Sequence, residues 1–389
     1  MSPVSAVVTT GIYCRDDCPA RPHPSNVIGY PFAAAAESDG FRACHRCRPY
    51  RVELDGSQAG PELVCRGIQL VADGALDNTT EGRLGARLGV SPRHLRRLFV
   101  EHTGVTPGQL ARSRRAHFAR RLLDDTDLRI AEIAFAAGFG SVRQLNRVLA
   151  EIFGAAPGDL RGRRRAADRL QADGGLALRL AHARPLDFDA ALRHLADRAI
   201  PTVENVTSTA YRRTITVDDA PGVIEITRRS ASELLLVAHL PRLGGLLHHV
   251  RRARRIFSLD SPARLPGTWD PFEIGVHGIV SADTRDPATT RVILGQIATR
   301  LGHPVTGLDQ LGLSRTFPAP DQLARSGLDG LPVSAQAARD LRSFAAAVAT
   351  DAIRLDHSWS GAWFQQAFRE SGLSPRLAAS TGLALPMPG

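Results

Sequence analysis

The chain has 389 residues, is 43% hydrophobic and carries a formal net charge of +10. This length exceeds what one core usually serves and predicts about two to four domains. All 49 basic residues are arginine, which excludes chemistry that requires a Schiff-base or phosphate-loop lysine. No apolar run approaches the roughly 20 residues needed to span a bilayer, and no signal pattern opens the chain. We therefore expect a cytoplasmic protein without membrane partners.

Residues 1–52 are predicted to form a small, loop-rich zinc module. They contain two close cysteine pairs, Cys14 with Cys18 and Cys44 with Cys47. Each pair can supply two thiolates from one turn, and four thiolates complete a tetrahedral Zn²⁺ site. Reduced thiols in the cytoplasm favour such a site over disulfides. Spacing alone favours a purely structural zinc site.

The residues around the cysteines point to further chemistry. The strings Gly-Ile-Tyr-Cys at 11–14 and Gly-Phe-Arg-Ala-Cys-His-Arg-Cys-Arg-Pro at 40–49 resemble the Ada-type methylphosphotriester repair domain. The resemblance implies that Cys14 is both a zinc ligand and the methyl acceptor, with Cys18, Cys44 and Cys47 as the other ligands. It also implies that neighbouring DNA phosphates are bound by Thr10, Arg21 and Arg42. The family usually has a longer segment before the first string, which predicts here a missing packing helix or a start placed too late.

Two other cysteine interpretations carry less weight. Ala43-Cys44-His45-Arg46 resembles the Pro-Cys-His-Arg site of alkylguanine transferases, but it lacks the proline and Cys47 lies at ligand spacing. Cys65 has apolar neighbours on a predicted helix and is expected to be a core thiol.

Pro49 to Gly60 is predicted to be a polar linker, and residues 61–166 have helical periodicity. Within them Leu95-x-Arg97 and Gly104-x-x-Pro107 recur 50 residues later as Leu145-x-Arg147 and Gly154-x-x-Pro157. Each copy predicts a helix, a tight glycine turn and a second helix. The predicted helices cover 81–88, a helix that Ser91 and Pro92 open, 130–137, and a helix that begins near Ser141.

This repeat resembles the AraC-type DNA-binding domain, in which two recognition helices about 34 Å apart enter successive major grooves. Residues 81–170 contain 18 arginines and 9 acidic residues, which indicates a phosphate-rich partner. The outward faces of the second helices carry Arg93, His94, Arg96 and Arg97, and Arg143, Gln144, Asn146 and Arg147. Such side chains suit guanine and adenine edges, and contact with the DNA backbone alone is the alternative. Core positions are Leu95, Leu98, Phe99, Leu145 and Val148.

An arginine-rich linker at 161–165 ends the helical region. The hydrophobic pattern then becomes that of short strands at 214–217, 223–227 and 234–239, which predicts a small antiparallel sheet. Helical segments follow, including 272–280 and 335–349. The strings at 199–206 and 265–273, with 317–320 and 328–331, resemble an AlkA-type alkyl-base DNA glycosylase. The resemblance implies an α+β domain at 177–260 and a helical glycosylase domain at 261–356. Such enzymes flip an alkylated base into an aromatic pocket and use one aspartate.

Two parts that this family needs are missing from the sequence. There is no Pro-Gly-Ile-Gly-like hairpin turn and no catalytic aspartate at the family's position. Four other aspartates could replace the catalytic one, but the favoured interpretation is that they are ordinary solvated carboxylates. They are Asp283, Asp340, Asp351 and Asp356. Residues 357–389 look like a frameshifted or truncated end and are predicted to be disordered. Weak DNA binding or a solvated face would each account for Arg251, Arg252, Arg254 and Arg255.

The expectation is a multidomain α+β chain: a zinc-bound module, an all-α double helix-turn-helix, and an α+β sheet domain with an incomplete helical glycosylase domain. The predicted function is a nucleoid-associated regulator that accepts methyl groups from double-stranded DNA and activates transcription with RNA polymerase. The alternatives are an active 3-methyladenine glycosylase with a regulatory N-terminus and an AraC-type factor with purely structural zinc.

Overall fold

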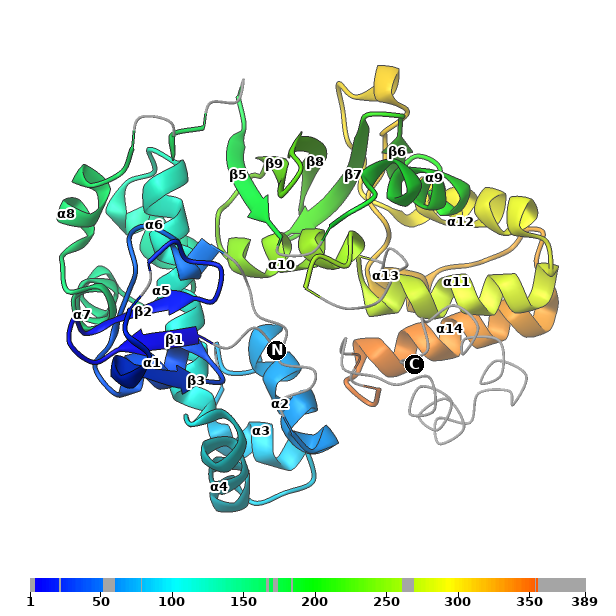
Figure 1. The fold of residues 1–389 in the computed structure, drawn as a ribbon. Coiled ribbons are helices and arrows are strands. Elements are labelled where there is room, and N and C mark those ends of the chain that lie inside the picture. Colours follow the sequence, from blue (N-terminus) through cyan, green and yellow to red (C-terminus); the bar gives the residue numbers. More distant parts are fainter. Residues whose placement is uncertain are drawn as a thin grey trace. The chain divides into compact units, whose positions relative to one another are not determined.

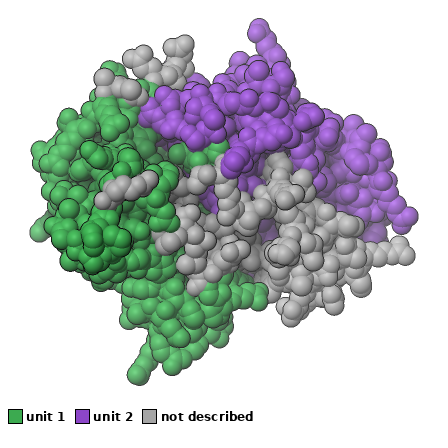
Figure 2. Space-filling view, in the orientation of Figure 1, with its two compact units in different colours: residues 1–171, 181–183, 243–251 green, residues 172–180, 184–242, 252–389 purple. Residues whose placement is uncertain are grey.

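The structure is a computed structural model that describes residues 4–20, 22–51, 60–77, 79–165, 168–170, 174–182, 185–260, 269–353 and 355. Figure 2 shows its two compact units, of which the first holds residues 1–171, 181–183 and 243–251 and the second holds the rest. Arg21, Asp356 and the predicted tail at 357–389 lie outside the described residues. Among the described helices, none is both long and apolar enough to cross a bilayer.

The first unit opens with a four-stranded sheet in the order β3-β1-β2-β4 (Figure 1). Strand β1 pairs antiparallel with β2 and β3, and β2 pairs in parallel with β4. The elements are β1 (Val4–Val7), β2 (Ile12–Arg15), η1 (Pro24–Asn26), β3 (Val27–Tyr30), α1 (Ala33–Ser38), β4 (Arg42–Ala43) and η2 (Pro49–Arg51). The parallel pairing of β2 with β4 brings the two cysteine pairs to the same edge of the sheet.

Seven helices of the double helix-turn-helix region follow, and they confirm the predicted repeat. They are α2 (Glu62–Ala72), α3 (Glu81–Arg87), α4 (Pro92–Thr103), α5 (Pro107–Asp125), α6 (Ile130–Ala136), α7 (Val142–Phe153) and α8 (Pro157–Gly162). The hydroxyls of Ser91 and Ser141 accept backbone N–H bonds at the starts of α4 and α7. Gly104 and Gly154 end these helices at φ of 78° and 68°, a backbone conformation that favours glycine.

The zinc module and the first helix-turn-helix share one hydrophobic core. Phe32 and Ala35, beside and within α1, are buried in the same cluster as Ile68 of α2, Phe99 of α4 and Leu110 of α5. The predicted linker also begins inside this folded body, because Pro49 and Tyr50 are buried in η2. The first unit therefore joins the cysteine-bearing sheet to the helices through continuous packing.

The second unit contains a five-stranded sheet in the order β5-β9-β8-β7-β6. Strands β6 to β9 pair antiparallel in sequence order, as expected for consecutive hairpins. The elements are β5 (Leu176–Ala181), α9 (Phe188–Arg198), β6 (Glu204–Val206), β7 (Ala210–Val217), β8 (Ala220–Ser230) and β9 (Glu233–His239). The predicted strands are confirmed, and each extends beyond its predicted bounds.

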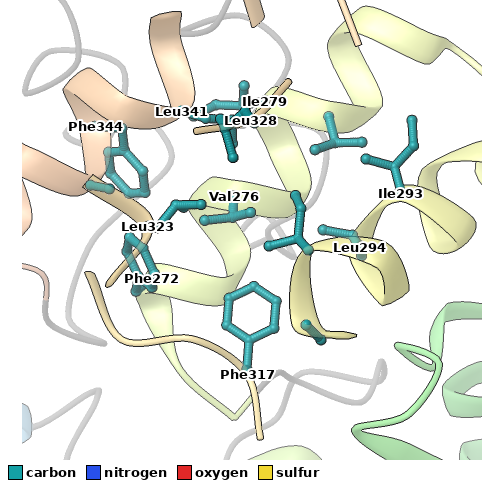
Figure 3. Close-up of a cluster of buried hydrophobic side chains, with 14 of the residues drawn as sticks. Phe272, Val276, Ile279, Ile293, Leu294, Phe317, Leu323, Leu328, Leu341 and Phe344 are labelled. Carbon is teal, nitrogen blue, oxygen red and sulfur yellow. The ribbon is translucent and has the colours of Figure 1, made fainter. Parts of the chain in front are cut away.

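Helices complete the second unit, and α11 lies beside α12 and α14 (Figure 1). Helix α10 (Leu246–Ile256) begins in the first unit and ends in the second. The other elements are α11 (Pro271–Thr284), α12 (Pro287–Leu301), η4 (Asp309–Leu311), α13 (Pro320–Arg325) and α14 (Ala335–Ala349). Figure 3 shows their apolar core, in which the rings of Phe272 and Phe344 stack with centroids 5.5 Å apart. Gly275 permits this approach, since a Cβ there would lie 2.3 Å from the Phe344 ring.

Candidate metal centre and DNA-binding surface

The four predicted cysteine ligands lie together in the first unit. Their Sγ atoms are all within 4.8 Å of one another. Cys14 lies in β2 and Cys18 in the turn that follows, where its N–H donates to the carbonyl of Arg15 at 3.1 Å. Cys44 directly follows β4 and donates its N–H to the carbonyl of Tyr13 at 3.0 Å. The two strands therefore bring the cysteine pairs together from opposite ends of the module.

This sulfur cluster fits a tetrahedral metal ion. A Zn²⁺ ion with Zn–S bonds of about 2.3 Å separates its sulfurs by about 3.8 Å, which is compatible with the observed cluster. Burial and the neighbouring sulfurs raise the pKa of the Cys14 thiol, and burial raises that of Cys47 to about 12. Four sulfurs so placed cannot all be anionic unless a cation lies among them.

The four sulfurs differ in the hydrogen bonds they accept. The N–H of Arg15 donates to Sγ of Cys47 at 3.5 Å, and the N–H of Arg46 donates to Sγ of Cys44 at 3.4 Å. Burial raises the pKa of Cys44, but donation from backbone N–H groups outweighs burial and lowers that pKa overall. No backbone N–H of the described residues donates to Sγ of Cys14. A thiolate without such donors keeps more electron density for attack on carbon.

Two of the three predicted phosphate-binding residues are exposed in the same sheet module as the cysteines. Thr10 lies in the exposed turn between β1 and β2. The exposed Arg42 begins β4 and donates its N–H to the carbonyl of Gly11 at 2.9 Å. The third, Arg21, lies outside the described residues. Further positive charge surrounds His45, whose pKa is lowered by burial and then by Arg120 and Arg163.

The cysteine-bearing strand also contacts the long helix α5 of the DNA-binding region. Tyr13, adjacent to Cys14, is fully buried, and its hydroxyl donates to Oε1 of Glu37 at 2.7 Å. Nε2 of His117 on α5 lies 2.5 Å from the same oxygen. The His117 ring in turn contacts the ring of Phe153 at the end of α7, with centroids 6.0 Å apart. Side-chain contacts through Tyr13, Glu37 and His117 therefore lead from the strand of Cys14 to the end of the second recognition helix.

On the first recognition helix, α4, three of the predicted DNA-binding residues are exposed and one is half-buried. Arg93, Arg96 and Arg97 are exposed, whereas His94 is half-buried and its Nδ1 lies 3.1 Å from Nη2 of Arg97. Arg96 forms an ion pair with Glu81 of α3, a residue that the sequence did not single out. Arg93 has no side-chain partner among the described residues, so its guanidinium is available to DNA.

On α7 the predicted residues divide in the same way. Arg143, Asn146 and Arg147 are exposed, and Arg147 lies 3.9 Å from Glu151 one turn later. Gln144 is half-buried, and its Oε1 accepts the N–H of Gly140 at 3.1 Å. That bond occupies the Gln144 side chain locally at the start of the helix. Arg143 and Asn146 make no side-chain hydrogen bond within the described part of the chain.

Three protein-family models match successive parts of the chain. The family model for the metal binding domain of Ada matches residues 3–50, that for a helix-turn-helix domain matches 84–163, and that for the AlkA N-terminal domain matches 177–270. A Mycobacterium tuberculosis protein named "probable bifunctional transcriptional activator/DNA repair enzyme AlkA" is 34% identical over 388 residues, which cover 91% of this chain and 76% of that protein.

The chain belongs to this Ada/AlkA family of bifunctional transcriptional activator/DNA repair proteins.

Two further relatives match parts of the chain. The Escherichia coli bifunctional transcriptional activator/DNA repair enzyme Ada is 36% identical over 123 residues, which cover 31% of this chain and 33% of that protein. A solved 3-methyladenine DNA-glycosylase from Archaeoglobus fulgidus is 14% identical, with a TM-score of 0.42, over 52% of this chain and 77% of its own.

Two of the candidate aspartates in the AlkA-like part of the chain already have structural partners. Asp283 accepts the N–H of Ser334 at 2.8 Å and its hydroxyl at 2.5 Å, which fixes the start of α14. Asp340 is buried, accepts from Nε2 of Gln336 at 2.9 Å, and has its pKa raised by burial. Asp351 lies in a left-handed turn at φ 59°, and Asp356 lies outside the described residues. None of the three described aspartates lines the pocket that α9, β6, β7 and α11 form in the second unit.

The sequence did not predict a pocket in this part of the chain. It lies in the second unit and is lined by residues of α9, β6, β7 and α11. The only local signal is the spacing of His194 and Arg198, which places both on one face of α9. His277 comes from α11, and no pattern in the sequence connects it with the other two.

Proposed function

We propose that this protein transfers the methyl group of a DNA methylphosphotriester irreversibly to Cys14, and that the methylated form binds promoter DNA more tightly and activates alkylation-repair genes. The observation that carries the proposal is the distribution of N–H donors in the sulfur cluster. Cys44 and Cys47 accept backbone N–H bonds, whereas Cys14 accepts none from the described residues, and the match to the Ada metal-binding domain supports Cys14 over Cys18 as the acceptor. Exposure alone would favour Cys47, which is only half-buried, but its hydrogen bond lowers its nucleophilicity.

The proposed chemical step is a displacement at carbon. The thiolate of Cys14 attacks the methyl carbon, so that the S–C bond forms while the C–O bond to the phosphotriester breaks. The electron pair of the C–O bond stays on the phosphate oxygen, which leaves an anionic phosphodiester and a thioether. Zn²⁺ held by the four cysteines would keep the sulfurs deprotonated at neutral pH. The reaction consumes the acceptor, so each chain acts once.

The same step would strengthen DNA binding. Four thiolates around a divalent cation carry two net negative charges, and the thioether removes one of them. Losing one unit charge about 7 Å from a phosphate is worth about 2 kcal/mol at an effective dielectric of 20, or roughly thirtyfold in affinity. Thr10, Arg21 and Arg42 would bind the phosphates on either side of the repaired one. Because salt screens this interaction, the gain should shrink as ionic strength rises.

The helix-turn-helix region would then direct the methylated protein to specific sites. The exposed Arg93, Arg143 and Asn146 suit base edges in successive major grooves, while Arg96, Arg97 and Arg147 suit phosphates. RNA polymerase is the proposed protein partner at the promoter, and the cytoplasm is the proposed compartment. We assign the zinc domain to residues 1–52 and the DNA-binding domain to 61–166.

We also propose that the glycosylase-like part, with an α+β domain at 177–260 and a helical domain at 261–356, does not excise bases. The family mechanism needs a free aspartate that faces the flipped nucleotide. In the described part of the chain, Asp283 and Asp340 serve as hydrogen-bond acceptors inside the fold. This supports a role for this part other than base excision.

The proposal is tested by methyl transfer from a duplex that contains one isotopically labelled methylphosphotriester. We expect stoichiometric transfer to the zinc-loaded full chain and none to Cys14→Ser, while Cys65→Ser, outside the cluster, serves as the matched control and reacts fully. Zinc content is measured for each variant by elemental analysis. A Cys14→Ser chain that retains zinc and still accepts the label would contradict the proposal. A wild-type chain that holds zinc but accepts no label would support a purely structural site.

A further inference from the structure

A partly open pocket lies in the second unit. The walls come from α9, from β6 and β7, and from the first turns of α11. The apolar part of the lining includes Leu195, Ile200 and Ile274.

The acidic groups of the pocket are already engaged. Oε1 of Glu204 accepts from Nη1 of Arg213 at 3.3 Å, and its Oε2 accepts the N–H of Ile200 at 2.8 Å. Oε1 of Glu273 accepts from Nη2 of Arg213 at 2.7 Å. Arg213, which is 1% exposed, is therefore paired with these two carboxylates. The pocket consequently offers few acceptors to a ligand.

Three other side chains of the pocket also carry nitrogen donors. Arg198, His194 and His277 are each half-buried, and none forms a side-chain hydrogen bond or ion pair with another described residue. Nδ1 of His277 is fully buried without any hydrogen-bond partner. A buried polar nitrogen without a partner is unfavourable, and a ligand group that pairs with it would relieve that cost.

The three side chains line the same pocket, and the charge of Arg198 acts on both histidines. Burial and then the charge of Arg198 lower the pKa of His277 to about 4, and they lower the pKa of His194 as well. Both rings are therefore neutral near pH 7, and each presents one N–H donor beside a permanent guanidinium charge. A planar guanidinium with two flanking N–H donors matches the oxygens of a carboxylate or phosphate.

We infer that this pocket binds the oxyanion of a small molecule, a carboxylate or a phosphate, with Arg198 as its charged partner and His194 and His277 as hydrogen-bond donors. The apolar side chains of Leu195, Ile200 and Ile274 would contact the body of the ligand. This site is independent of methyl transfer at Cys14. It would make the second unit of this chain a ligand-binding domain.

The test is isothermal titration calorimetry of the zinc-loaded full chain with two probes, benzoate and inorganic phosphate. We expect saturable binding of at least one probe and tighter binding of benzoate if the apolar wall contributes. Arg198→Gln should weaken binding about tenfold or more, since a charge-assisted hydrogen bond is lost. Arg193→Gln, one turn earlier on α9 and outside the pocket, is the matched control and should leave affinity unchanged.

A second measurement follows the ring protons of His194 and His277 by NMR, assigned with His→Asn variants. Both sets should shift with the same midpoint as the calorimetric titration. The absence of saturable binding, or equal weakening by the two arginine variants, would overturn the inference. Displacement of bound benzoate by a short unmethylated duplex would assign the donors to the DNA backbone and also overturn the small-molecule site.

Discussion

The phenol of Tyr50 donates a hydrogen bond to Oδ2 of Asp124, 74 residues further along the chain, at 3.0 Å. Nη2 of Arg51 reaches the same oxygen at 3.1 Å, and Arg120 pairs with the other carboxylate oxygen. The side chain of Asp124 is fully buried. The end of the zinc module is therefore held on α5 by a buried charge cluster, and folding of the module and of the helices should be coupled.

Asp124→Ala is expected to destabilise the first unit by about 3 kcal/mol or more, because it leaves two arginines buried without their shared carboxylate. Asp127→Ala is the matched control, since Asp127 is half-exposed and pairs with Arg164 and Arg169 at the surface. That change should cost less than about 1 kcal/mol. Urea denaturation of the zinc-loaded chain measures both, and equal losses would contradict the coupling.

Much of the fold could be predicted because local signals agreed with the final structure. Serine caps at 91 and 141 and glycines at 104 and 154 mark the recognition helices, and the predicted helix at 335–349 is α14 residue for residue. Alternating strands gave the sheet of the second unit. The cysteine spacing predicted the cluster because each pair lies within one turn.

What could not be predicted depends on contacts between distant residues. The segment at 49–51 looks like the start of a polar linker, yet it packs on α5 through Tyr50 and Arg51. Tyr13 and His117 are 104 residues apart and share Glu37 as a partner. Gln144 has a suitable side chain for reading adenine, but the fold gives it a backbone partner. Sequence periodicity contains no information on such pairs.

Stability of the second unit should fall as pH rises through the neutral range. Burial, together with Asp270 and Glu204, outweighs Arg213 and raises the pKa of Glu273 from 4.5 to about 7. The folded state thus binds a proton that the unfolded state releases. The resulting contribution to the free energy of unfolding is complete below pH 4.5 and is lost as the pH approaches and passes 7. The loss is up to about 3 kcal/mol.

Thermal melting between pH 5 and 8 tests this titration, with Glu273→Gln as the comparison. The variant keeps the shape of the side chain and removes the ionisation, so its melting temperature should vary less with pH. Glu225→Gln, a surface partner of Arg212, is the control and should retain the wild-type slope. The same slope in wild type and in Glu273→Gln would rule out Glu273 as the titrating group.

Arg143→Ala should weaken binding to a duplex that the wild-type protein selects from a random library by about tenfold or more. The exposed guanidinium has no partner in the described structure, and one good base contact is worth about 1 to 3 kcal/mol. Arg169→Ala removes the same charge outside the recognition helices and should have a smaller effect. Electrophoretic mobility shifts at fixed salt decide between the two, and equal effects would indicate general electrostatic attraction alone.

Alkylated DNA incubated with the purified chain should release no 3-methyladenine above the level of a protein-free control. The reason is that Asp283 and Asp340 are occupied by structural hydrogen bonds. Chromatography of the released bases measures this directly. Release that disappears in Asp340→Asn but persists in Asp321→Asn, a surface control, would show an active glycosylase and contradict our assignment.

The most direct measurement of the central claim uses trypsin and mass spectrometry after reaction with methylphosphotriester DNA. Arginines at 15, 42 and 46 separate the cysteines, so the four zinc ligands fall on four different tryptic peptides. We predict a mass increase of one CH₂ unit on the peptide Met1–Arg15, which contains Cys14 alone, and no change on the other three. The added mass on the peptide that begins at Cys47, or on none of the four, would contradict the account.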